Sequence, residues 1–134
     1  MSKAPDSRPK SDDHLVSAEL IAIAAMNEQM LDELPFGAIR LDREGFILGY
    51  NRFESRLSGL EPTRVIGRNF FTQVAPCTNV KEFAGRLREG VARGELHVEF
   101  PYVFTFNPPR QVLVTLYFHK PTGNSWVLVK TTTV

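Results

Sequence analysis

The sequence predicts an α+β domain built on a five-stranded antiparallel sheet. Two short strand patterns come early, the middle of the chain has helical patterns, and the C-terminal third returns to strand patterns. The chain has 134 residues, of which 43% are hydrophobic and 23% charged, as in an ordinary globular domain. This length favours one domain, and the order of the patterns favours strands and helices segregated along the chain.

The N-terminal region predicts a leader followed by a helical cap. Residues 1–13 are almost devoid of apolar side chains, so we expect them to be disordered. Asp12 or Asp13 is suited to cap a helix whose apolar residues recur at helical spacing as far as Leu34, and Pro35 ends it. We therefore expect residues 14–34 to form a helical cap outside a domain of residues 35–134.

The next segment predicts a hairpin and three helices. Residues 36–42 alternate apolar and polar, residues 42–45 form a turn, and residues 46–51 return as the second strand. We expect short helices that end at Gly59 and Gly67, and a longer one over residues 80–92. The longer helix would be opened by the capping pair Asn79 and Glu82 and stopped by Gly94.

The remaining sequence predicts three strands joined by hairpins, over residues 97–106, 111–120 and 126–134. In the first of them an apolar stripe recurs at every second residue and would lie on one face: Val98, Phe100, Tyr102, Phe104 and Phe106. This stripe is more typical of a core than of a ligand pocket. Because the chain ends with its last strand, we expect it to carry no catalytic or output domain.

Charge and cysteine content exclude several function classes. Sixteen Lys and Arg against fifteen Asp and Glu leave a net charge of +1, without the basic excess of a nucleic-acid or anionic-membrane partner. The longest apolar run, residues 20–26, is far shorter than the ~20 residues of a membrane span. Cys77 is the only cysteine, which excludes an intrachain disulfide and suits the cytoplasm. The three histidines are scattered, so we expect no zinc site.

Two sites in the sequence carry reactive or hydrogen-bonding side chains. Cys77 lies just before the predicted helix of residues 80–92, where a helix amino end favours a reactive thiolate, although a lone cysteine is more often a packed core residue. Tyr50, Glu54 and Ser58 are spaced four apart, so a helix beginning after Tyr50 would align them on one face. Such a stripe indicates either a hydrogen-bonding patch around an anion or a solvated helical face.

Six motifs occur in one order between about Leu31 and Lys130: FGAIRLD, ILGYN, VIGRNFF, VAPCT, EFAGRLREGVARGEL and WVLVK. Together they resemble the photoactive yellow protein family, which comprises bacterial blue-light receptors with a PAS-type fold. VIGRNFF followed closely by VAPCT is not a general PAS pattern. The resemblance implies a PAS-like photosensor domain with an N-terminal helical cap.

The resemblance also implies a chromophore site. Cys77 would anchor p-coumaric (4-hydroxycinnamic) acid as a thioester, and Tyr50 and Glu54 would hydrogen-bond its phenolate oxygen. Ser58 stands where the family commonly has threonine. The remaining implied residues line the pocket or shape the loop of the thiol: Phe70, Val74, Ala75, Pro76, Tyr102 and Phe104.

The sequence departs from the family pattern at three places, of which the first two concern kinetics and colour. Leu60 replaces an arginine that shields the ring, residues 107–110 (Asn-Pro-Pro-Arg) replace a loop with a methionine, and Phe106 replaces a tyrosine. We expect dark recovery to be slow, because that methionine is thought to help the chromophore re-isomerise.

The resulting hypothesis is a blue-light receptor and not an enzyme. Isomerisation, proton transfer from Glu54 and partial unfolding of the cap would signal to a downstream protein not yet identified, with the chain a cytoplasmic monomer or weak dimer. A PAS-like ligand-binding or interaction module without a chromophore and a small thiol enzyme using Cys77 are the alternatives. The joint presence of Tyr50, Glu54 and Cys77 favours the photoreceptor, because a plain interaction domain needs none of the three.

Overall fold

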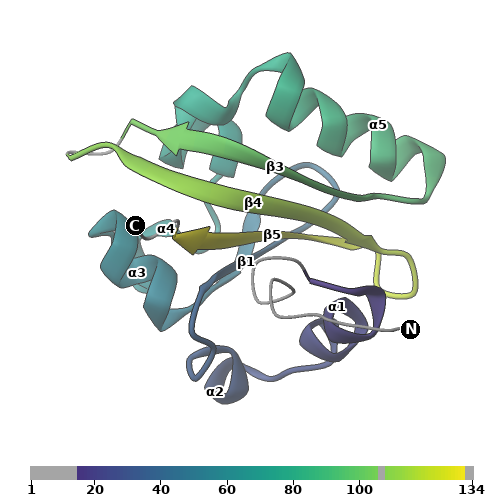
Figure 1. Cartoon of the computed structure of the whole chain (residues 1–134), viewed down its shortest axis with the longest axis horizontal. Coiled ribbons are helices and arrows are strands. Elements are labelled where there is room, and N and C mark those ends of the chain that lie inside the picture. Colours follow the sequence, from purple (N-terminus) through teal and green to yellow (C-terminus); the bar gives the residue numbers. More distant parts are fainter. Residues whose placement is uncertain (1–14, 106–107, 132–134) are drawn as a thin grey trace, which may run out of the picture.

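The fold is a five-stranded antiparallel sheet with helices on both faces (Figure 1). The computed structural model describes residues 15–105 and 108–131. The strands lie in the order β2-β1-β5-β4-β3, and every neighbouring pair is antiparallel. Their bounds are β1 Gly37–Leu41, β2 Ile47–Tyr50, β3 His97–Phe104, β4 Arg110–His119 and β5 Asn124–Thr131. The predicted fold class is confirmed, whereas the expected leader, Asn107 and Phe106 lie outside the described residues.

The segment between β2 and β3 consists of short helices and helical turns. They are α3 Arg52–Ser58, α4 Pro62–Val65, the π-helical turn η3 Phe70–Val74, the 3-10 turn η4 Pro76–Thr78, the π-helical turn η5 Lys81–Gly85 and α5 Arg86–Arg93. Gly59 and Gly94 follow α3 and α5 with φ angles of 78° and 79°, a left-handed conformation that favours glycine. The helix ends predicted at these glycines are confirmed.

The predicted α-helix over residues 80–92 is wrong in its first turn. This turn is a π-helical turn, in which the Gly85 N–H donates to the Val80 carbonyl at 3.1 Å. The predicted Asn79–Glu82 cap is also wrong, because the turn begins at Val80 without a side-chain cap. The wider turn brings the consecutive residues Phe83 and Ala84 into the core, both 0% exposed.

The predicted single helix of the cap is two short helices. α1 spans Ser17–Ala24 and α2 spans Glu28–Leu31. The side chain of Asn27 accepts a hydrogen bond from the Met30 N–H, so a second helix begins there. Asp12 and Asp13 lie outside the described residues. The last strand also differs, because β5 begins at Asn124 and not at Trp126.

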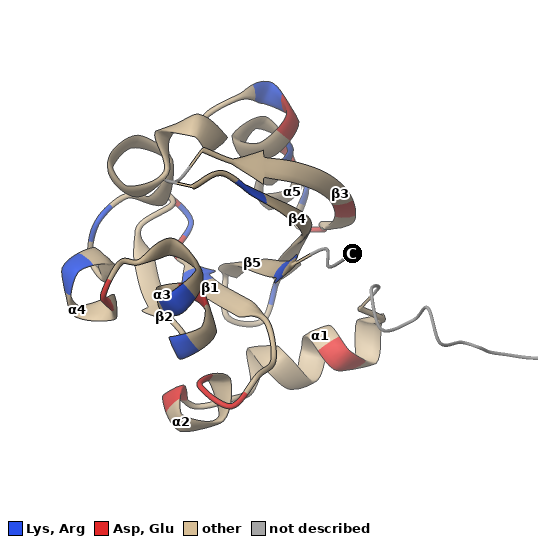
Figure 2. Cartoon of the chain, turned by 60° about the vertical axis from the view of Figure 1, so that its left-hand side comes forward, with Lys and Arg blue, Asp and Glu red and all other residues tan. Residues whose placement is uncertain are grey.

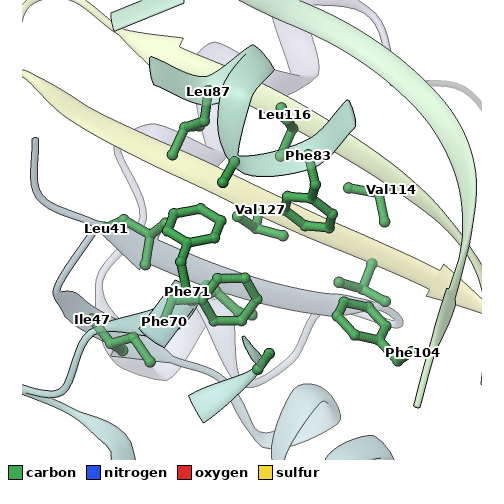
Figure 3. Close-up of a cluster of buried hydrophobic side chains, with 14 of the residues drawn as sticks. Leu41, Ile47, Phe70, Phe71, Phe83, Leu87, Phe104, Val114, Leu116 and Val127 are labelled. Carbon is green, nitrogen blue, oxygen red and sulfur yellow. The ribbon is translucent and has the colours of Figure 1, made fainter. Parts of the chain in front are cut away.

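The sheet separates two hydrophobic clusters. The inner cluster lies between the sheet and the segment from α3 to α5, and it is centred on Phe83 (Figure 3). The Phe83 ring makes edge contacts with Phe71, Phe100 and Tyr102 at centroid distances of 5.2–6.0 Å. Phe100 and Phe104 of β3 are buried in this cluster, with Val98 and Tyr102 packed against it. The apolar face predicted for this strand is therefore confirmed at these four positions.

The outer cluster lies on the opposite face, beneath the cap. It joins Leu15, Leu20, Ile23 and Leu31 of the cap region to Phe36, Ala38, Trp126 and Leu128. Figure 1 shows α1 and α2 on the side of the sheet away from α5. Among the described residues, no helix has the length and apolar character needed to cross a membrane.

Candidate functional site

A hydrogen-bonded pair of hydroxyls joins the end of β2 to α3. β2 ends at Tyr50, and Asn51 caps α3 because its side-chain oxygen accepts from the Glu54 N–H at 3.0 Å. The roughly two turns of α3 bring Ser58 back to Tyr50, and their hydroxyl oxygens are 2.7 Å apart. The predicted alignment after Tyr50 therefore produces a contact and not a solvated face.

Glu54 is a buried carboxyl in the middle of this stripe. The residue is 1% exposed, and its Oε1 is buried without a hydrogen-bond partner among the described residues. Burial raises the pKa of Glu54 from 4.5 to about 8, so the folded protein holds it neutral at neutral pH. A protonated carboxyl is a hydrogen-bond donor as well as an acceptor.

Gly37 of β1 makes room for this carboxyl. A Cβ atom added at Gly37 would collide with Oε1 of Glu54. The space that the carboxyl occupies therefore depends on the absence of a side chain on the neighbouring strand.

Tyr50 remains a phenol across the physiological pH range. Burial, followed by the Glu54 carboxyl, raises its pKa above the ordinary value of 10.0, while the hydrogen bond with Ser58 acts in the opposite direction. Tyr50 and Glu54 therefore provide two protonated oxygens in one buried region. Such a pair is suited to donate to an anionic oxygen.

Cys77 lies in η4, on the side of the sheet that carries the inner cluster. The thiol residue is half-buried and packs against that cluster. The Tyr102 hydroxyl donates to the Cys77 carbonyl oxygen at 2.5 Å, and the Thr78 hydroxyl donates to the Ala75 carbonyl at 2.6 Å. The loop is thus tied to β3, whereas the expected position at the start of a long α-helix is corrected to a 3-10 turn.

The structure brings most of the predicted site residues to one cluster. Tyr50, Phe70 and Phe104 are buried members of the inner cluster, and Leu60, Val74, Cys77 and Tyr102 pack against it. Ser58 joins through Tyr50, Ala75 is buried, and Pro76 begins η4 with an exposed side chain. Glu54 lies against Gly37.

Two further residues shape the site and escaped the sequence analysis. Asn51 is buried, and its amide donates to the carbonyls of Leu31 and Phe36 while its oxygen accepts from Ala38 N–H and Glu54 N–H. An asparagine directly before a helix is an N-cap signal that could have found it. Gly37 carried no such signal, because its role depends on the packing of α3 against β1.

The fold and the site define the class. A family model described as "PAS fold" matches residues 25–121, so the chain is a PAS domain. The photoactive yellow protein of Rhodothalassium salexigens is 49% identical over 111 residues, which cover 81% of this chain and 88% of that protein. The photoactive yellow protein of Halochromatium salexigens is 44% identical over 110 residues, with the same coverage.

A solved structure agrees with these relatives. The photoactive yellow protein domain of the sensor histidine kinase Ppr from Rhodospirillum centenum superposes with a TM-score of 0.77 at 46% identity. The match covers 81% of this chain and 96% of that domain. This chain belongs to the photoactive yellow protein family. The relatives support a photoreceptor of that type and a sensory role.

Proposed function

We propose that this chain is a blue-light receptor that carries p-coumaric acid as a thioester on Cys77. The proposal rests mainly on the buried, protonated carboxyl of Glu54. Its Oε1 has no hydrogen-bond partner among the described residues, and it interacts electrostatically with Tyr50, which is hydrogen-bonded to Ser58. A polar group buried without a partner costs free energy, so its presence favours a ligand that it binds. Membership of the family supplies the chemical identity of that ligand.

The side chains present fit this group. A phenol has an ordinary pKa of about 10, so holding its anion in a protein at neutral pH requires donors that outweigh desolvation. Tyr50 and protonated Glu54 are two such donors. Cys77 would lose its thiol proton and displace the activating group of the acid, which leaves a thioester. Bound there, the group supplies absorption of blue light and trans–cis isomerisation of its double bond.

The response of the protein then depends on Glu54. When light disturbs the hydrogen bonds of the site, Glu54 would be the group that gives up its carboxyl proton, and it would then be a carboxylate at a position 1% exposed. Arg52 and Arg56 on the same helix are exposed. An unpaired buried charge costs several kcal/mol, comparable to the stability of a domain, so the least stable element opens.

That element is the cap of residues 15–34. Its opening exposes the outer cluster to a downstream signalling protein, and the chain acts as a cytoplasmic monomer or weak dimer without enzymatic activity. Leu60 and residues 107–110, where the sequence differs from the family pattern, affect recovery rate and colour and not attachment.

Reconstitution with activated p-coumaric acid tests the proposal. We expect a yellow product, bleached by blue light, with a mass increase on Cys77. Cys77→Ala should fold without acquiring the adduct, whereas the control Ser58→Ala should acquire it with a changed absorption spectrum. A colourless protein with an intact thiol would instead indicate a PAS module without a chromophore.

Difference infrared spectroscopy tests the proton donor. Illumination should remove a protonated-carboxyl band in the reconstituted protein, and Glu54→Gln should lack this change. Glu61→Gln, at an exposed carboxyl, is the matched control and should retain it. A band change that persists in Glu54→Gln would assign the proton to another group.

A further inference from the structure

The cap and the remaining domain carry opposite net charges. Residues 15–34 contain Glu19, Glu28, Asp32 and Glu33 and no Lys or Arg, so their net charge is −4 with every carboxyl ionised. Residues 35–131 contain thirteen Lys or Arg and eight Asp or Glu, a net charge of +5 on the same basis. Figure 2 shows acidic residues on α1 and α2, and mostly basic ones on the neighbouring elements of the domain.

The surface beneath the cap is aromatic and flanked by cations. The guanidinium carbon of Arg40 lies 5.9 Å from the ring centroid of Trp126, and Nζ of Lys130 lies 5.2 Å from the ring centroid of Phe36. Trp126 and Phe36 are both buried against the apolar side chains of the cap. We call Phe36, Arg40, Trp126 and Lys130 the cap seat.

One edge of the cap seat is incompletely filled. A cleft of about 520 Å³ separates α2 from α4, with Glu28 and Asp32 on the cap side and Arg40 and Thr63 on the domain side. The Nε atom of Arg40 is buried and has no hydrogen-bond partner among the described residues. A buried guanidinium donor without a partner favours an incoming carboxylate.

We infer that the cap seat, once the cap is displaced, binds an acidic amphipathic helix of a partner protein. Apolar side chains of this helix cover Trp126 and Phe36, and its carboxylates face Arg40 and Lys130. The cap is the intramolecular precedent, since it places Leu20, Ile23 and Leu31 on this surface from a segment whose charged groups are all acidic. The inference rests on the proposed function only for light as the trigger.

Binding of a defined peptide to the full-length chain tests the inference without light. The double substitution Leu20→Ala and Ile23→Ala weakens the cap, and the probe is a labelled peptide with the sequence of residues 15–34. We expect this peptide to bind the cap-weakened chain, and more weakly as salt rises. Replacing its four acidic residues by Gln or Asn should weaken binding roughly tenfold.

Substitutions in the seat provide the matched comparison. Arg40→Gln with Lys130→Gln should weaken binding of the acidic peptide roughly tenfold. Lys81→Gln with Arg88→Gln removes the same charge from exposed positions on the opposite side of the sheet and should leave binding unchanged. Circular dichroism of each variant confirms that the sheet is retained.

The outcomes separate this inference from the proposed function. Equal binding of acidic and neutral peptides, or indifference to Arg40 and Lys130, would overturn it. Binding to vesicles of anionic lipid without binding to the peptide would also overturn it, in favour of a membrane surface. Peptide binding by the cap-weakened chain in the dark, with none by the illuminated reconstituted protein, would uphold the seat and reject light as its trigger.

Discussion

The two faces of the sheet differ in how much structure they hold. Among the described residues, the inner cluster joins twenty buried residues from the sheet and the helical segment, including Phe83 and four rings that contact it, and Tyr50 and Cys77 belong to that side. The outer cluster joins eight, of which four come from the cap region. We therefore expect the face that holds Tyr50 and Cys77 to cost more free energy to open than the face that residues 15–34 cover.

Hydrogen bonds between described residues also join the cap to the domain. The Arg52 N–H donates to Asp32 at 2.7 Å, the Asn51 amide donates to the Leu31 carbonyl at 2.8 Å, and the Leu15 N–H donates to Glu99 at 3.0 Å. Asn51 also accepts from the Glu54 N–H, so one side chain touches both the site helix and the cap. If Glu54 ionises, Asn51 therefore links the helix that carries the charge directly to the cap.

The largest expected effect is a cavity in the inner cluster. Phe83→Ala should lower the free energy of unfolding of the whole domain by about 3–5 kcal/mol, because the ring is 0% exposed and contacts several other rings. Denaturant unfolding measures this. The control Phe46→Ala, at a residue 40% exposed, should cost much less. Equal losses in the two variants would contradict the central role given to Phe83.

The next effect is a pH dependence produced by Glu54. The unfolded chain releases this proton near pH 4.5 and the folded chain near pH 8, so stability is fully present below 4.5 and falls as pH rises to about 8. At about 1.4 kcal/mol per pH unit, the loss between pH 5 and 8 approaches 4 kcal/mol as an upper limit. Glu54→Gln should remove this decline.

Denaturant titrations of the unreconstituted protein at several pH values measure how its free energy of unfolding depends on pH. Glu61→Gln, at an exposed carboxyl, should follow the wild type. If the free energy of unfolding changes with pH equally in the wild type and in Glu54→Gln, the carboxyl ionises as readily in the folded chain as in the unfolded one.

The sequence predicted the features that depend on periodicity and on local chain geometry. The two-residue repeat of Phe100, Tyr102 and Phe104 identifies the inner face of β3, because successive side chains of a strand alternate between faces. Gly59 and Gly94 mark helix ends because a left-handed residue is needed there. The four-residue spacing of Tyr50, Glu54 and Ser58 predicted that they share one helical face, and the hydroxyls of Tyr50 and Ser58 meet on that face.

Features that depend on packing between elements could not be predicted in this way. The apolar pattern of residues 80–92 predicts a regular α-helix. The structure instead has a π-helical turn there, which places the consecutive residues Phe83 and Ala84 both in the core. The chain breaks between α1 and α2 because Asn27 caps the start of a second helix. The spacing of apolar residues contains no information about such a polar capping residue. The burial of Glu54 depends on Gly37, which lies on a neighbouring strand seventeen residues earlier in the chain.

A cavity in the outer cluster should act locally. Leu20→Ala removes a side chain that is 1% exposed, and we expect it to favour cap opening by about 2–3 kcal/mol. Amide hydrogen exchange should therefore accelerate in α1 and α2 and remain slow in β4 and β5. Ile21→Ala, at a residue 56% exposed on the same helix, is the control and should change little. Equal acceleration in the cap and the sheet would show that the two faces open together.

The smallest expected effect concerns the first residue of the described cap region. Glu99 lies on β3, and its Oε2 accepts from both the Leu15 N–H and the Thr115 hydroxyl at 3.0 Å. The other face of β3 carries Phe100 in the inner cluster and Tyr102 against it. Glu99 therefore joins the start of the cap to a strand that also contacts the Cys77 loop through Tyr102.

Glu99→Ala should weaken this tie without disturbing the inner cluster. A hydrogen bond to a charged acceptor that is partly exposed contributes about 1 kcal/mol, so amide exchange at Leu15 and in α1 should rise about fivefold. The denaturant midpoint of the sheet should stay within error, and Glu95→Ala, at an exposed residue just before β3, should leave α1 unchanged. Thr115→Val, which removes the second donor and keeps the carboxylate, should give a smaller acceleration in the same amides. If Glu99→Ala leaves exchange in α1 at the wild-type rate, the cap is held by its apolar contacts and by Asn51 and Asp32 alone, and β3 has no direct hold on it.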